Sequence, residues 1–272
     1  ANDNKNVIAQ IIKLRLEKAN LLGYDNYSSF VLDECMAKSP ATVMDFLNNL
    51  WKYTLPKTKA EAAELQKMMD EEKKGEKLEA WDWWYYTERL RKAKYDLNED
   101  ELKPYFRIEN VRDGAFDVAK KLYGINLTKL NNIPVYHPDV EVFEVTDADG
   151  SHLGIFYVDY FPRSGKSGGA WMSNYRDQKG DIRPLVCNVS SYTKPVGNMP
   201  SFLTLDEVTT LFHEFGHRLH GLLTKCNYLE VSGTNVVRDF VELPSQIMEH
   251  WATQPEVLKS YAKHYQTGEV IP

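Results

Sequence analysis

The sequence predicts a mainly α-helical protein with one small β-sheet. Through the first 130 residues, apolar side chains recur at helical spacing. From about residue 133, apolar and polar residues alternate as in half-buried strands, and from Ser201 the helical spacing returns. We therefore expect a helical region over residues 1–132. A second region, over residues 133–272, should contain the sheet and the helices that carry the candidate site.

Composition excludes several classes of protein. Lys and Arg number 33 against 39 Asp and Glu, a net charge of −6 that argues against nucleic-acid binding by overall charge. No apolar run approaches the ~20 residues of a transmembrane helix, and ANDNKNVIAQ contains no apolar signal core. The cysteines (Cys35, Cys187 and Cys226) have no CxxC spacing, so neither a disulfide framework nor a cysteine zinc site is indicated. We expect a cytoplasmic monomer that binds neither nucleic acid nor membranes.

Helices are predicted in order along the first region. NVIAQIIKLRLEKANLLG has helical apolar spacing and ends at Gly23. Ser39 and Pro40 open a second helix. Residues 56–79 are rich in Lys, Glu, Ala and Met and predict a charged amphipathic helix. Its buried stripe would consist of Ala62, Leu65, Met68 and Met69.

Four aromatic residues follow one another in WDWWYYTERL, from Trp83 to Tyr86. Such a cluster could line a ligand cleft. Aromatic residues at helical spacing are more often part of a core, and we favour that interpretation.

Strands are predicted after residue 133. DVEVFEVT and LGIFYVDYF flank the turn from Asp147 to Gly150 and predict a β-hairpin, and PLVCNVSS predicts a further strand. Between them lies RSGKSGGAW, rich in Gly and Ser. It is not a phosphate-binding loop, because the glycine spacing ahead of its GK is missing and no helix follows.

The histidines gather near the end of the sequence, where His213, His217, His220, His250 and His264 account for five of the seven. LTLDEVTTLFHEFGHRLHGLL begins with the capping box Thr204–Glu207 and has one apolar face, so it predicts a helix.

That helix contains the HExxH pattern of His213, Glu214 and His217. Residues four apart lie about 40° apart around a helix and about 6 Å apart along it, so two imidazoles can converge on one ion. Glu214 would stand beside them as the general base that accepts a proton from a water. The pattern therefore predicts a hydrolytic zinc site.

A catalytic zinc needs a third protein ligand. The HExxHxxGxxH pattern is not met, because His220 and Leu223 occupy the positions of its Gly and final His. RDFVELPSQIMEHW offers acidic residues on a following helix, and Pro244 is tolerable in its first turn. We expect Glu242 to be the ligand, with Asp239 or Glu249 orienting the imidazoles. The alternative is that these glutamates are solvated charges.

Several stretches together resemble a known family. FHEFGHRLHGLL, RDFVELPSQIMEHW, KLRLEKANLLGYDNYSSF, WDWWYYTERLRKAKYDLNEDELKPYF, VRDGAFDVAKKLYGI and RSGKSGGAWM are similar to the thimet oligopeptidase family of zinc metallopeptidases. This family includes oligopeptidase A and peptidyl-dipeptidase Dcp. The stretches MAKSP and GGAWM resemble the peptidyl-dipeptidase branch most.

The resemblance implies a helical, zincin-like (gluzincin) peptidase fold with a deep channel, part of whose wall residues 1–132 would form. One Zn²⁺ per chain would be held by His213, His217 and Glu242. GGAWM would be an edge strand that pairs with short peptide substrates, with Gly168, Gly169 and Ala170 in that role. The reaction would be peptide-bond hydrolysis that releases C-terminal dipeptides, although the sequence does not separate this from endopeptidase cleavage.

Family members are longer at both ends, so the resemblance implies a truncated chain that covers their central part. The Tyr and His that stabilise the oxyanion in the family lie beyond the matched part. We therefore expect the zinc ligands without the full catalytic set, and little hydrolysis by this polypeptide alone. Two other interpretations stay open: a zinc-holding scaffold without turnover, and a helical interaction protein in which HExxH is accidental.

Overall fold

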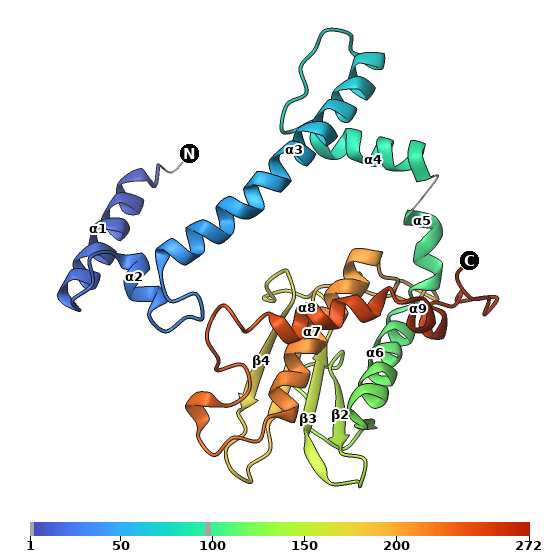
Figure 1. The fold of residues 1–272 in the computed structure, drawn as a ribbon. Helices are drawn as coiled ribbons and strands as arrows, with labels where there is room; N and C mark the ends of the chain where they lie inside the picture. Colours follow the sequence, from blue (N-terminus) through green and yellow to red (C-terminus); the bar gives the residue numbers. More distant parts are fainter. Residues whose placement is uncertain (1–2, 96–98) are drawn as a thin grey trace. The chain divides into compact units, whose positions relative to one another are not determined.

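The computed structural model describes residues 3–95 and 99–272. The chain divides into two compact units, residues 1–98 and residues 99–272 (Figure 1). Helices and one five-stranded sheet make up the fold, which confirms the predicted class of a helical protein with a small sheet. Within the described ranges, no helix combines the length and apolar character needed to cross a bilayer.

The described part of the first unit is helical. Its elements are α1 (Lys5–Leu21), α2 (Tyr27–Leu32), α3 (Pro40–Glu72) and α4 (Trp83–Tyr95). α1 stops just before Gly23, whose φ of 87° takes the left-handed conformation that ends helices. The Ser39 side chain caps α3 by accepting a hydrogen bond from the Thr42 N–H, as the Ser39–Pro40 pair predicts.

The two helices expected on either side of Pro56 are one continuous helix, α3. It also ends at Glu72 rather than near residue 79. Proline removes one backbone hydrogen bond from a helix interior. The residues around Pro56 are largely exposed, so water can satisfy the freed carbonyl and the helix passes through.

The pairing of α3 with α4 forms a small core of Leu65, Met69 and Tyr86. Lys94 on α4 reinforces the pair with 2.7 Å contacts to the Glu64 carboxylate on α3. The aromatic run is thus core at Tyr86, whereas Trp84 is 80% exposed. A helix turns successive residues by about 100°, so neighbouring aromatic side chains cannot all face the same partner.

The second unit contains the sheet. Its helices are α5 (Glu99–Leu102), η1 (Lys103–Tyr105), α6 (Ile108–Tyr123), α7 (Leu205–Leu223), η2 (Leu229–Val231), α8 (Leu243–Ala252) and α9 (Pro255–Tyr261). Its strands are β1 (Asn126–Leu130), β2 (Glu141–Thr146), β3 (His152–Asp159), β4 (Trp171–Arg176) and β5 (Leu185–Val189). The strand order is β1-β2-β3-β5-β4.

The predicted hairpin is β2–β3, paired in register at Phe143 and Phe156. β3 pairs with β5 in parallel, and the other neighbours are antiparallel. β4 follows β3 in the sequence but pairs with β5, so it lies at the edge of the sheet. Of the stretch GGAWM, only Trp171 and Met172 belong to this edge strand, whereas Gly168, Gly169 and Ala170 lie in the loop before it.

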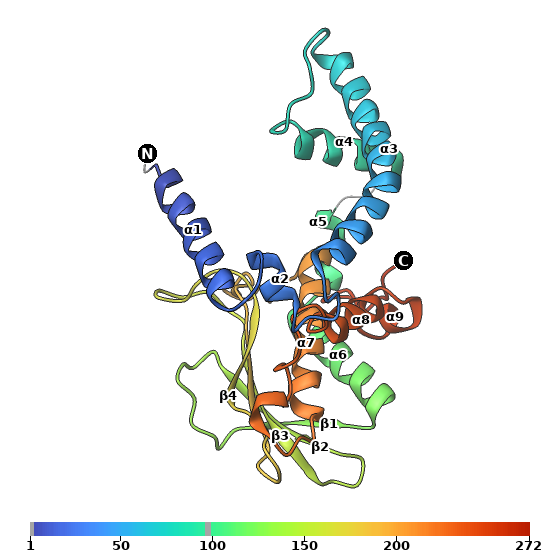
Figure 2. The ribbon, with the colours of Figure 1, turned by 60° about the vertical axis from the view of Figure 1, so that its left-hand side comes forward.

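Helices α6 and α7 cover one face of the sheet (Figure 2). Phe116 on α6 contacts Phe143 and Phe156, and Phe215 on α7 contacts Phe156 and Phe116. Because this packing buries one side of α6 against strands, α6 belongs to the second unit. The boundary between the units therefore lies after residue 98 in the sequence. The expected regions were divided later, at the change of periodicity between residues 132 and 133.

Candidate metal centre

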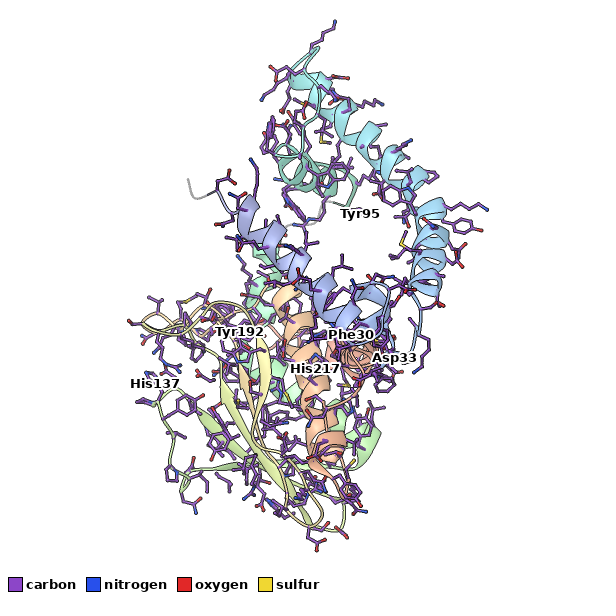
Figure 3. The ribbon with its side chains drawn as sticks, turned by 90° about the vertical axis from the view of Figure 1, so that its left-hand side faces the viewer. Phe30, Asp33, Tyr95, His137, Tyr192 and His217 are labelled. Atoms are coloured by element: carbon purple, nitrogen blue, oxygen red, sulfur yellow. The ribbon has the colours of Figure 1, made fainter. Side chains whose placement is uncertain are left out.

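Helix α7 carries the HExxH residues and starts where the capping box predicts. The Thr204 side chain accepts a hydrogen bond from the Glu207 N–H, and the Glu207 carboxylate accepts one from the Thr204 N–H. Its apolar side is buried in the core of the second unit. The buried apolar residues are Val208, Leu211, Phe212, Phe215, Leu219 and Leu222. The core therefore fixes the rotation of α7, and with it the directions of His213 and His217; His217 is labelled on this helix in Figure 3.

Helix α8 crosses α7 at Gly216. A β-carbon on Gly216 would lie 2.6 Å from the Ser245 α-carbon and 2.7 Å from the Pro244 carbonyl oxygen, closer than real β-carbons approach. Glycine therefore allows this contact. It places Glu242, which immediately precedes α8, beside the two histidines.

Three ligand atoms converge at this crossing. Glu242 Oε2 lies 3.2 Å from His213 Nε2 and 3.0 Å from His217 Nε2. All three atoms lie within 4.8 Å of one another. Ligand atoms held about 2.1 Å from a tetrahedral ion are separated by about 3.4 Å, so the spacing and the N, N, O chemistry fit zinc. The structure thus brings together the three residues predicted as ligands.

Glu249 contacts one of the imidazoles. Nδ1 of His213 lies 2.6 Å from Glu249 Oε1, an arrangement that leaves Nε2 free to bind a metal. Asp239, the other expected partner, is not on the same helix as Glu249. It lies in the turn before α8, because the helix begins with Leu243 and has Pro244 in its first turn.

The site favours a neutral His217. Burial lowers the pKa of His217, an effect that Glu242 opposes. A metal requires the neutral imidazole, so this environment suits a ligand. The Glu242 carboxylate is held in place by Ser245, whose Oγ lies 3.0 Å from Glu242 Oε2. The ExxS spacing of Glu242 and Ser245 is visible in the sequence, but it predicts no role for Ser245, since the bond depends on the local backbone turn.

Glu214 projects from α7 next to the ligands and is 7% exposed. Burial raises the pKa of its carboxyl, while Arg218 and His213 act in the opposite direction. Its Oε2 atom has no hydrogen-bond partner among the described residues. A buried carboxylate with a raised pKa and a free oxygen is suited to accept a proton.

An open cleft of about 380 Å³ adjoins these residues. It is lined by Ala170, Trp171, Met172, His213, Glu214, His217, Thr234, Val241 and Glu242. Of the expected substrate-binding residues, Ala170 lines the cleft, whereas Gly168 and Gly169 precede it in the loop before β4. Trp171 and Met172 continue the predicted edge strand, but Thr234 and Val241 come from irregular segments that show no periodic signal.

A larger cavity, of about 440 Å³, lies between α6 and the β1–β2 region. Its cations Arg112 and Lys129 both pair with Glu141, and Arg112 also pairs with Asp113, so two carboxylates match the two positive charges. The cleft beside α7 is therefore the better candidate for chemistry.

Comparisons with known proteins point to a family of peptidases. A model of peptidase family M3 matches residues 1–272. The chain is 44% identical over 275 residues to a dipeptidyl carboxypeptidase of Salmonella typhimurium and 43% identical over 275 residues to that of Escherichia coli, with all of this chain aligned in both. It is 40% identical over 276 residues to oligopeptidase A of Escherichia coli, with 99% of this chain aligned. The chain spans 40–41% of the length of these relatives.

Proposed function

The chain belongs to peptidase family M3, and we propose that it binds one zinc ion and hydrolyses peptide bonds in short oligopeptides. The observation that carries this proposal is the convergence of His213, His217 and Glu242 around one point, with Glu214 beside them. The names of the relatives, dipeptidyl carboxypeptidase and oligopeptidase A, support peptides as substrates.

In this proposal each residue has a defined role. His213, His217 and Glu242 hold the ion, and Glu249 fixes the ring of His213. Zinc in such a ligand set supplies a Lewis acid and lowers the pKa of a coordinated water towards about 7. Glu214 accepts a proton from the attacking water and passes it to the leaving amine.

The peptide binds along β4. An edge strand offers unpaired backbone groups to which an extended peptide can add as a further strand. Ala170, Trp171 and Met172 border the cleft that contains Glu214, so a peptide paired there passes the metal ligands. Gly168 and Gly169 would leave room for the peptide backbone, since a β-carbon at either would have no neighbour within 4 Å.

Release of C-terminal dipeptides is the mode of cleavage we propose, since relatives at 44% and 43% identity are named dipeptidyl carboxypeptidases. Endopeptidase cleavage is the alternative, because oligopeptidase A is nearly as similar. Mass spectrometry of the products from a library of unblocked peptides distinguishes the two. Dipeptides from the C-terminus support the first mode, and internal cleavage at varied positions supports the second.

A second candidate is a zinc-binding protein without turnover. The convergence of His213, His217 and Glu242 is common to both candidates, and only turnover separates them. Stoichiometric zinc combined with intact peptides after prolonged incubation would support this candidate.

Elemental analysis of the purified chain tests the metal site directly. We expect about one zinc per chain. Glu242→Ala should lose zinc, and Glu256→Ala, which removes an exposed carboxylate on α9, should keep it. Failure of the unaltered chain to bind zinc even after reconstitution would refute the proposed function.

A further inference from the structure

A buried ionic cluster surrounds Asp159 at the end of β3. The Asp159 side chain is 1% exposed. Its carboxylate accepts two hydrogen bonds of 2.8 Å from Arg163, one of 2.9 Å from Lys166 and one of 3.0 Å from the Tyr136 hydroxyl. Two cations and a phenol thus compensate one buried carboxylate.

Lys166 links this cluster to the backbone of the loop that follows β3. Its side chain is 4% exposed. The ammonium also donates to the carbonyl oxygens of Asp159, at 3.0 Å, and Phe161, at 2.7 Å. An ammonium has three donors, and all three are satisfied here. Lys166, the lysine of RSGKSGGAW, therefore connects the middle of the loop to its first residues by hydrogen bonds.

The same loop carries the proposed substrate edge. It connects β3 to β4, and because β5 lies between these strands, the loop must pass the end of β5. There the Ser191 hydroxyl donates to the Ser167 carbonyl at 3.2 Å. Beyond this second attachment the chain turns through Gly169, whose φ is 100°, and enters the cleft at Ala170.

Net stability alone is a weak explanation for this cluster. Replacing a buried ion pair with well-packed apolar residues is often neutral or stabilising, so buried charges are a poor source of net stability. Buried charges instead hold the segments that carry them in one arrangement, because each charge needs its partners in a particular geometry. Here the defined arrangement is that of the loop leading to β4.

We propose that Asp159 is a positioning residue that acts through Lys166 and Arg163: it holds the loop over residues 161–170 so that Ala170 and the start of β4 meet the peptide at the correct distance from the metal ligands. The inference rests on the proposed function. According to this inference, the Asp159 cluster influences how tightly the peptide binds. Zinc binding depends instead on the ligands carried by α7 and by Glu242 before α8.

Lys166→Met is the variant of choice for testing this role. It leaves Asp159 paired with Arg163 and Tyr136, so no buried carboxylate is left uncompensated. Arg163→Gln is the second variant, because it leaves Lys166 in place. Lys121→Met is the matched control, since it removes a lysine from an exposed ion pair with Asp117 on α6.

Three measurements are made on each protein: zinc content, amide hydrogen exchange by mass spectrometry, and kinetics with a quenched fluorescent hexapeptide. In Lys166→Met we expect faster exchange over residues 161–173, with α7 and zinc content unchanged. KM should rise about tenfold while kcat changes less than about threefold, as expected when one or two hydrogen bonds to the peptide backbone are weakened. Lys121→Met should match the parent throughout.

The outcomes separate this inference from the proposed function. If the parent cleaves peptide and both cluster variants keep its exchange pattern and KM, the positioning role is refuted. A fall in kcat and zinc content with unchanged KM also refutes it, because the cluster would then support the metal site. If the parent does not cleave the hexapeptide, the proposed hydrolysis fails, and fluorescence-anisotropy binding of a labelled hexapeptide replaces KM, with the same tenfold weakening expected. A parent that neither cleaves nor binds peptide refutes both.

Discussion

The Ser245 α-carbon occupies the space next to Gly216 so fully that an added β-carbon would lie 2.6 Å from it. This contact joins the HExxH helix to the helix that follows Glu242. The contact with α8 therefore requires glycine at position 216. The HExxH pattern alone would allow any residue there.

Gly216→Ala should separate α7 from α8. Overpacking at such a site costs about 1–3 kcal/mol of unfolding free energy. It should also weaken zinc binding, because Glu242 moves with α8. Urea denaturation and zinc titration measure the two effects. Gly168→Ala serves as the control for both, since its β-carbon would have no neighbour within 4 Å; equal behaviour of the two variants would contradict the prediction.

Glu249→Ala should lower zinc affinity without abolishing it. Loss of the partner of His213 Nδ1 frees the imidazole to rotate, and such losses typically cost about 10- to 100-fold in metal affinity. Competition with a chelator of known affinity measures the change. Glu256→Ala, on the neighbouring helix α9, should bind zinc as the parent does. Similar affinities for both variants would show that Glu249 does not orient the ring.

Glu214→Gln should keep zinc and lose hydrolysis. The amide resembles the carboxylate in shape but cannot accept the proton, and a general base contributes about 10²- to 10⁴-fold to rate. Steady-state kinetics and elemental analysis are measured on the same preparation. A variant with full zinc and undiminished kcat/KM would remove Glu214 from the mechanism.

Asp159→Asn should destabilise the second unit by about 3–5 kcal/mol, the usual cost of removing one partner from a buried ionic group. Hydrogen bonds from Arg163 and Lys166 hold the pKa of Asp159 below its ordinary value, although burial acts against them. A lowered pKa means that the carboxylate stabilises the fold above the unfolded pKa of 3.8 and loses this effect as the pH falls through the folded value. The difference between variant and parent should therefore be constant from about pH 5 to pH 8.

Urea denaturation across this range measures that difference. Asp117→Asn, which removes a partly exposed carboxylate from α6, should change stability by less than about 0.5 kcal/mol. A difference for Asp159→Asn that grows or disappears between pH 5 and pH 8 would show that another group dominates.

Local signals in the sequence predicted the centre of the site. The capping box fixed the start of α7, and the spacing of His213 and His217 follows from helix geometry. Glu242 was expected because a third ligand is needed and an acidic helix follows. These features depend on residues close together in the chain, so periodicity and capping reveal them.

Features that depend on distant contacts were not predictable. Gly216 acquires its contact with Ser245 only when α8 packs on α7, and Lys166 acquires its partners only when its loop folds back to β3. The prediction of two separate helices around Pro56 was wrong, because α3 continues through the proline. Water can bond to the backbone carbonyl that the proline leaves without a hydrogen-bond donor.

The edge position of β4 has a further consequence, for solubility. Unpaired strand edges invite self-association, and proteins limit this with bulges and charged residues. The pairing of β4 with β5 shifts register between Asn174 and Arg176, and Arg176 places a cation at the end of the strand. Regular pairing with β5 is thereby restricted to the few residues from Trp171 to Asn174, which limits growth of an intermolecular sheet.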